Sequence, residues 1–303
     1  MKKVLVCKEK DARETRVSLI PDDIKKLTSM GFEFKVVAGA GLKSGFNDEA
    51  YRTAGAQIVK TEEEAYDSSE IIVRIMKPES IKGIKKDTLH LSYMDPFNES
   101  QLLNDFASNG IQAVSLEMIP RTTLAQKMDV QSSQTSLAGY VAVLNAAARL
   151  PKILPMMVTP AGTINPARVF IIGVGVAGLQ AIATAKVFGR KAPRLIEKSV
   201  LDRMMPGSIV VDMAVSTGGN VEGSKLFEDV VTENGVTIMS GDLLERQVPY
   251  DASKMFSGNI TAFLTHFYNK EKKEMEVRLE DEIMKGCLLT KGGQIIHERF
   301  INK

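Results

Sequence analysis

The stretch ARVFIIGVGVAGLQAIATAKVFG, residues 167–189, carries the clearest fold signal in the chain. Its apolar run at 168–172 predicts a β-strand, and residues 177–189 predict a helix. Three glycines between them follow the spacing G-x-G-x-x-G: Gly173, Gly175 and Gly178. A strand, this glycine turn and a helix in direct succession are the context in which the spacing is typical of a dinucleotide-binding site.

Each glycine of this turn has its own physical reason. The first permits the tight turn, the second lets the backbone approach a pyrophosphate, and the third lets helix and strand pack closely. The helix N-terminus then offers unpaired N–H groups and the positive end of its dipole to the phosphates. We therefore predict that the cofactor is bound at Gly173, Val174, Gly175, Val176, Ala177 and Gly178. The alternative is a glycine-rich turn with no ligand.

A dinucleotide site also needs an acidic residue about 20 positions further on, at the end of the next strand, to bind the ribose hydroxyls. Glu197 has about this spacing if PRLI, residues 193–196, is that strand. The segment EKSVLDRMMPG, residues 197–207, fits a helix better, with Glu197 in its first turn beside the positive dipole end. We prefer the helix and keep Glu197 as the candidate for the ribose contact.

The rest of the chain alternates strand and helix signals. Apolar runs such as KKVLVCKE, residues 2–9, and FEFKVVAGAG, residues 32–41, predict strands. Between them PDDIKKLTSMG, residues 21–31, predicts a helix that begins at a proline and ends at a glycine. A long apolar helix, residues 135–150, is expected to connect two domains. This alternation predicts an α/β fold of two βα domains with parallel sheets, the second a shortened Rossmann-like domain.

Composition excludes several classes of function. The chain has 303 residues, enough for two domains, and a formal net charge of +2 without a long basic run, which gives no electrostatic case for nucleic acid. Cys7 and Cys287 are far apart and show no metal-ligand spacing, so we expect reduced thiols and no metal site. The most apolar stretch, residues 169–185, contains three Gly, a Gln and a Thr, so we expect no membrane span.

Six segments together resemble the alanine dehydrogenase and nicotinamide nucleotide transhydrogenase family, and the resemblance covers nearly the whole chain. They are KEKDARETRVSLIPDDIKKL (8–27), GAGLKSGFNDEAYRTAGAQIV (39–59), RTTLAQKMDVQSSQTSLAGYVAV (121–143), TPAGTINPARVFIIGVGVAGLQAIATAK (159–186), PGSIVVDMAVSTGGNVE (206–222) and RLEDEIMKGCLLTKGGQIIH (278–297). The resemblance implies a flavodoxin-like domain, residues 1–131 plus a returning tail 250–303. It also implies a truncated Rossmann domain, residues 132–249, that binds NAD(H) and is opened by the connecting helix.

Within the family, the chain is most similar to the soluble NAD(H)-binding part of the proton-translocating transhydrogenases. There, a loop beside the nicotinamide contributes an Arg, a Gln and an Asp, which fall on Arg121, Gln126 and Asp129, with a nearby serine at Ser132. A hydride that passes directly between two nicotinamides needs no acid or base, so catalysis is mostly positioning. Without the resemblance, this segment would be interpreted as a polar loop that caps a helix.

The same resemblance implies partners. NADP(H) is expected on a partner subunit, proton movement in a separate membrane-embedded subunit, and a homodimer of this chain. The expected location is cytoplasmic, peripheral on the cytoplasmic side of the inner membrane.

An alanine dehydrogenase-like enzyme is the less favoured alternative. Those enzymes bind pyruvate with an Arg, which matches Arg16, and with a Lys, whose position falls on Met76. Their catalytic His falls near Met94, and an expected Asp is Ser216 here. An enzyme that protonates an imino acid needs a titratable group there, so its absence argues against this chemistry.

The resemblance also indicates a missing segment. In the family, AKVFG (185–189) continues into a second strand with its ribose-binding acid, whereas here it leads straight into RKAPRLI (190–196). Several tens of residues are absent, so the strand at 168–172 must pair with SIVVDM (208–213) directly or leave ladder groups and apolar faces exposed. The further alternative is therefore a non-catalytic relic that dimerises or docks partners with impaired nucleotide binding.

Overall fold

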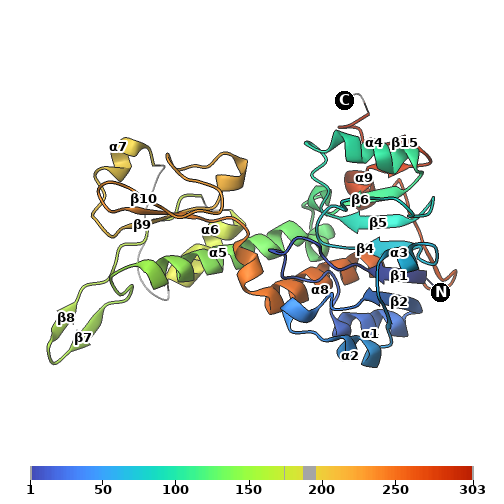
Figure 1. Cartoon of the computed structure of the whole chain (residues 1–303), viewed down its shortest axis with the longest axis horizontal. Coiled ribbons are helices and arrows are strands. Elements are labelled where there is room, and N and C mark those ends of the chain that lie inside the picture. Colours follow the sequence, from blue (N-terminus) through green and yellow to red (C-terminus); the bar gives the residue numbers. More distant parts are fainter. Residues whose placement is uncertain (1, 174, 187–195, 302–303) are drawn as a thin grey trace. The chain divides into compact units, whose positions relative to one another are not determined.

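The computed structural model describes residues 2–173, 175–186 and 196–301, and the chain divides into two compact units (Figure 1). The first unit comprises Met1–Ser133 and Pro249–Lys303, and the second comprises Gln134–Val248. Both ends of the chain therefore belong to the first unit.

A six-stranded parallel sheet forms the centre of the first unit, in the order β3-β2-β1-β4-β5-β6. Its strands are β1 (Lys2–Val6), β2 (Phe32–Val37), β3 (Gln57–Val59), β4 (Ile71–Val73), β5 (Leu89–Ser92) and β6 (Gln112–Ser115). The register is set on the central strand, where Val4 lies opposite Phe34 of β2 and Ile71 of β4. The strand order reverses between β1 and β4, the switch point of a doubly wound sheet.

Helices connect these strands, as the alternation in the sequence predicts. They are α1 (Pro21–Ser29), α2 (Asp48–Thr53), α3 (Glu63–Tyr66) and α4 (Ser100–Ser108), with 3-10 turns η1 (Leu42–Ser44), η2 (Leu116–Met118) and η3 (Ala125–Met128). Pro21 starts α1 because its fixed φ suits the first helical position, and Gly31 follows the end of α1 at φ 105°. Ile24 and Leu27 of α1 are fully buried against the sheet.

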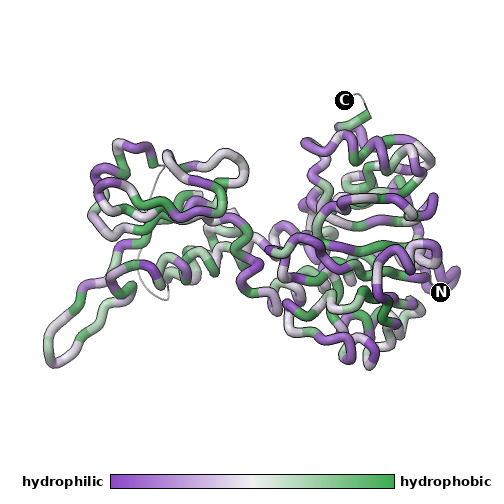
Figure 2. The backbone as a smooth tube through the Cα atoms, viewed as in Figure 1, coloured by the Kyte–Doolittle hydropathy of each residue, from purple (hydrophilic) through white to green (hydrophobic). Residues whose placement is uncertain are grey.

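The tail of the chain completes the first unit with α8 (Pro249–Phe267), α9 (Glu282–Cys287) and two short hairpins. The hairpin strands are β12 (Tyr268–Asn269), β13 (Glu274–Met275), β14 (Thr290–Lys291) and β15 (Gln294–Ile295). Gly292 and Gly293 form the turn between β14 and β15, and both have positive φ, as a two-residue hairpin turn requires. Phe256, Phe263 and Phe267 of α8 are buried in the same core as β1 and β2, and apolar segments run through the centre of this unit (Figure 2).

The second unit begins within the long helix α5 (Val130–Arg149) and contains a sheet of only three described strands, in the order β10-β11-β9. Its other elements are α6 (Val176–Lys186), α7 (Lys198–Leu201), β9 (Ile209–Asp212), η4 (Val215–Thr217), β10 (Val230–Val231), β11 (Thr237–Ser240), η5 (Leu244–Gln247) and a separate hairpin β7 (Met157–Thr159) and β8 (Gly162–Ile164). Strands β9 and β11 are parallel, so the predicted α/β class holds in both units.

The strand predicted at 168–172 is wrong, because these residues form no strand in the structure. Strand β9 pairs with β11 rather than with this segment, and Phe170 and Ile172 remain 49% and 41% exposed. The missing segment left two possibilities for residues 168–172: direct pairing with residues 208–213, or exposure of their apolar side chains. The structure shows the second. An apolar run becomes a strand only where neighbouring strands satisfy its N–H and C=O groups. The junction that follows α6, residues 187–195, lies outside the described residues.

Candidate functional site

The glycine turn keeps the geometry that its spacing requires. Gly173 has φ 88°, and a Cβ on Gly178 would lie 2.0 Å from the Gly173 carbonyl oxygen, so only glycine permits this approach. A Cβ on Gly175, in contrast, would meet no atom within 4 Å. The turn is thus closely packed at one glycine and open at the other, which is where a pyrophosphate would approach. Val174 lies outside the described residues.

Helix α6 starts directly at this turn. The Leu179 N–H donates to the Gly175 carbonyl at 2.8 Å, which closes the first helical turn. The amides of Val176, Ala177 and Gly178 precede it, and helix geometry gives such N–H groups no intrahelical acceptor. Gly175 and Val176 are exposed, so these donors are accessible at the positive end of an 11-residue helix. The turn therefore fits the phosphates of a dinucleotide, the group that the sequence predicts.

The predicted nicotinamide loop, residues 121–132, brings three of its four candidate residues together. The Asp129 carboxylate accepts from the Ser132 N–H at 2.9 Å and from the Ser132 hydroxyl at 2.5 Å. The Arg121 Nε lies 3.9 Å from Asp129 Oδ2, and the Arg121 Nη2 donates to Gln131 Oε1 at 3.3 Å. The Asp129 contacts cap the start of α5, as expected if the segment is a polar loop that caps a helix. A cap and a cofactor contact are compatible, because a carboxylate accepts more than two hydrogen bonds.

Gln126 does not contact this cluster through any described hydrogen bond. It lies exposed in η3, whose other residues include the buried Ala125 and Met128. The Arg121 side chain is likewise mostly exposed. The loop therefore presents an amide and a guanidinium outward from a backbone that is anchored by two buried side chains.

The helix expected at 197–207 is shorter in the structure, where α7 spans Lys198–Leu201. Glu197 is its N-cap residue rather than part of its first turn, and the Glu197 side chain makes no cap hydrogen bond. The Lys198 N–H instead donates to Glu222 Oε2 at 2.8 Å. Glu197 is exposed, so its carboxylate is accessible, but it does not follow a described strand as a ribose-binding acid does.

Two of the positions that differ from alanine dehydrogenases, Met76 and Met94, hold methionines, which have no titratable group. Met76 packs partly buried against the core, and Met94 is fully buried, with its N–H donating to Glu117 Oε1 at 2.7 Å. Arg16 is buried and forms a bidentate pair with Glu14, with N–O distances of 2.7 Å. The charge that a pyruvate carboxylate would need is therefore already matched by Glu14.

Charged groups also fill the switch point at the carboxyl ends of β1 and β4. The buried Arg74 pairs with Glu62 at 3.2 Å, and the Glu9 carboxylate accepts from the amides of Ile75 and Met76. Burial raises the pKa of Glu9 more than the nearby Arg74 lowers it. Arg74 and Glu9 thus each have a partner within the chain, although the buried Arg74 Nε has no hydrogen-bond partner among the described residues.

Two further residues organise candidate loops and were missed from the sequence. Asp212, at the end of β9, accepts from the amides of Ala214, Asn220 and Val221 and from the Ser224 hydroxyl, so it shapes the loop that carries the exposed Ser216. Its signal was an Asp that ends an apolar run before a Gly-Gly pair. Asn259 of α8 bonds the nicotinamide loop from 132 positions away, and no specific signal in the sequence pointed to it, because α8 contains several other polar residues.

Comparison with known proteins identifies the family of the chain. The family model described as "Alanine dehydrogenase/PNT, N-terminal domain" matches residues 5–138. The model described as "Alanine dehydrogenase/PNT, C-terminal domain" matches residues 142–189 and 182–298. The chain belongs to the alanine dehydrogenase/PNT family. This family contains two named groups of oxidoreductases, and the more similar relatives of this chain are transhydrogenase subunits.

Three family members illustrate the relation. The chain is 30% identical to the first part of the NAD(P) transhydrogenase alpha subunit of Rhodospirillum rubrum, over 97% of this chain and 98% of that protein. It is 25% identical to alanine dehydrogenase of Bacillus subtilis over 72% and 71%. The crystal structure of transhydrogenase from Sinorhizobium meliloti superposes with a TM-score of 0.89 at 32% identity, covering 97% of this chain and all of that chain.

The alanine dehydrogenase/PNT comparison also bears on the missing segment. The alignment to the Rhodospirillum rubrum protein runs over 376 positions against 303 residues here, so at least 73 positions have no counterpart in this chain. The C-terminal family model matches in two pieces that overlap at residues 182–189. Both findings agree with the loss of several tens of residues just after α6.

The described residues show neither a membrane span nor a metal centre. None of their helices combines the length and apolar character needed to cross a membrane. No group of three His, Cys, Asp or Glu side chains within residues 2–173, 175–186 and 196–301 is arranged to hold a metal ion.

Proposed function

We propose that this chain is the NAD(H)-binding component of a proton-translocating NAD(P) transhydrogenase, and thus an enzyme component that acts with partner subunits. The observation that carries the proposal is the glycine turn, in which Gly178 packs tightly on Gly173 while Gly175 stays open. The phosphates bind at the amides of Val176, Ala177 and Gly178. A second copy of this chain, a membrane-embedded subunit and an NADP(H)-binding subunit complete the assembly on the cytoplasmic side of the inner membrane.

The role of the chain in catalysis is positioning. When bound, the dihydronicotinamide ring supplies the hydride. Arg121 and Gln126 offer donors for the carboxamide and riboside, and Asp129 with Ser132 offers acceptors that are held at fixed separation. None of these groups needs to move a proton during the transfer, so their contribution is orientation toward the NADP(H) of the partner. Glu197 is the carboxylate that remains as a candidate for the adenosine ribose.

Calorimetric titration of NADH into the purified chain at fixed salt tests the proposal. We expect binding in the native protein and its loss in Gly175→Val, because the new side chain occupies the space of the pyrophosphate. The fold of Gly175→Val should be unchanged, since a Cβ there meets no neighbouring atom. A folded native protein that binds no NADH would overturn the proposal. Binding that survives in Gly175→Val would move the site away from this turn.

A non-catalytic role is the second candidate, and the exposed Phe170 and Ile172 favour it. A segment that should be the first strand of the cofactor domain carries no described strand pairing, so the loss of nucleotide binding with retained dimerisation is physically reasonable. A transhydrogenation assay with the membrane-embedded and NADP(H)-binding partners separates the two candidates, because only the first gives NADH-dependent reduction of NADP.

A further inference from the structure

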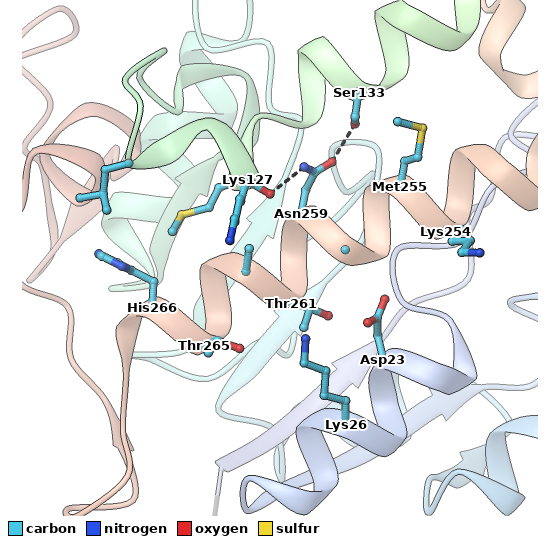
Figure 3. Close-up of a pocket in the computed structure, with 14 residues that line it drawn as sticks. Asp23, Lys26, Lys127, Ser133, Lys254, Met255, Asn259, Thr261, Thr265 and His266 are labelled. Atoms are coloured by element: carbon cyan, nitrogen blue, oxygen red, sulfur yellow. Dashed lines mark hydrogen bonds between the residues drawn. The ribbon is translucent and has the colours of Figure 1, made fainter.

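Asn259 of α8 has a buried side-chain amide that donates one hydrogen bond and accepts another. Its Nδ2 donates to the Lys127 carbonyl at 2.8 Å, and its Oδ1 accepts from the Ser133 hydroxyl at 2.7 Å (Figure 3). The side chain is only 8% exposed. The Lys127 carbonyl can only accept, so the amide nitrogen must face it, and the amide oxygen is then left for Ser133. This orientation follows from the partners alone.

The two contacts lie on either side of Asp129. Lys127 is in η3, before Asp129, and Ser133 is in the first turn of α5, after it. The Ser133 N–H also donates to the Asp129 carbonyl at 3.3 Å. Asn259 therefore ties together the two ends of the short segment that carries the Asp129 and Ser132 contact.

Buried apolar side chains also pack the same segment against α8. Ala125 and Met128 belong to the core cluster that also contains Phe256, Ile260 and Phe263 of α8. Between these anchors the Gln126 and Lys127 side chains are exposed. Apolar contacts fix the distance of the loop from α8, but they are not directional, whereas the two hydrogen bonds of Asn259 also fix its position along the helix.

We infer that Asn259 is a positioning residue for the nicotinamide loop. It holds the Lys127 carbonyl and the Ser133 hydroxyl, so that Gln126, Asp129 and Ser132 keep their mutual geometry. The inference rests on the proposed function and adds a residue from the C-terminal tail to it. Because a displacement of about 1 Å in a positioning group costs roughly 100-fold in rate, we expect loss of the amide to lower hydride transfer about 10- to 100-fold. NADH affinity should change less than about threefold, because the phosphates bind at the glycine turn.

Asn259→Asp is the decisive variant. It keeps the shape of the side chain but replaces the donor that faces the Lys127 carbonyl with an acceptor. Thr261→Val is the matched control, since it lies two residues away on α8 and removes a buried hydroxyl that has no hydrogen-bond partner among the described residues. Ser133→Ala removes one of the two Asn259 bonds, together with the contact of that hydroxyl with the Val130 carbonyl, and serves if Asn259→Asp does not fold.

Three measurements on each variant give separate readouts: amide hydrogen exchange at residues 125–133, NADH affinity, and single-turnover hydride transfer with the NADP(H)-binding partner. We expect Asn259→Asp to speed exchange in this segment and slow transfer with little loss of affinity, and Thr261→Val to behave as the native protein. Unchanged exchange, or faster exchange with an unchanged transfer rate, would overturn the positioning role alone. A native protein that transfers no hydride would instead overturn the proposed function, and the inference with it.

Discussion

In the first unit, β1 and β4 each have a parallel neighbour on both sides, whereas β9 of the second unit pairs with β11 and with no other described strand. The difference extends to the side chains. The largest fully buried residues of the described chain, which include Phe32, Phe106 and Phe256, all belong to the first unit. The second unit buries clusters of alanine and small aliphatic residues and leaves Phe170 and Leu179 about half exposed.

This contrast shows that the parts of a βα unit depend on different partners: a turn depends on neighbouring residues, whereas a strand depends on other strands. The glycine turn of the second unit retains its local geometry because that depends on neighbouring residues only. Residues 168–172 form no strand because no described strand of this chain lies beside them to satisfy their N–H and C=O groups. The first unit thus has a six-stranded sheet, whereas the second carries the glycine turn beside a sheet of three described strands.

The largest expected effect is the difference between equivalent truncations in the two units. Phe256→Ala removes a ring that is fully buried in the first unit and should lower the free energy of unfolding by about 3–5 kcal/mol. Leu179→Ala, at 57% exposure in the second unit, should change it by less than about 0.5 kcal/mol. Urea unfolding followed by circular dichroism measures both. Equal effects would mean that the exposed face is covered in solution.

Restoring the missing segment should remove the contrast. With the corresponding stretch of the Rhodospirillum rubrum protein inserted between α6 and α7, we expect a second strand and a ribose-binding acid at its end. Two charge-assisted hydrogen bonds are worth roughly 2–4 kcal/mol, so NADH should bind some thirty- to several-hundred-fold more tightly. Calorimetry on both forms measures this, and equal affinities would show that the lost contacts do not limit binding. Amide exchange at 168–172 should slow in the same variant.

The first unit also has its own pH dependence. His90 in β5 is fully buried and its two ring nitrogens have no hydrogen-bond partner among the described residues. Burial, with the positive charge of Arg74, lowers its pKa to about 3. Its contribution to the stability of the first unit is therefore complete above about pH 6.5 and is lost as the pH falls toward 3, because only the unfolded state is protonated in that window.

The expected slope from His90 alone is about 1.4 kcal/mol per pH unit between about pH 6 and pH 3. Carboxylates add their own slopes, so the test compares urea unfolding of the native protein with that of His90→Leu at several pH values. The native stability should fall faster, by that amount, below pH 6. Parallel curves would mean that the folded protein can protonate His90 at its ordinary pKa.

Local sequence determined a large part of this molecule. Helix α1 begins at Pro21 and ends just before Gly31, and Gly292 and Gly293 form the turn of the last hairpin. The glycine spacing gives the turn at Gly173–Gly178. Each of these features depends on φ preferences or contacts within a few residues. The family and the missing segment were also readable from the sequence, since motifs flank the junction on both sides.

Only the tertiary structure decided the rest. Nothing within 168–172 shows that it forms no strand, because pairing depends on residues far away or absent. The sequence near Arg121–Asp129 does not indicate Asn259. Asn259 reaches the loop only because the C-terminal tail returns to the first unit and α8 packs against η3. Local conformational preferences are encoded residue by residue, whereas long-range hydrogen bonds and sheet edges exist only when the folded chain brings their partners together.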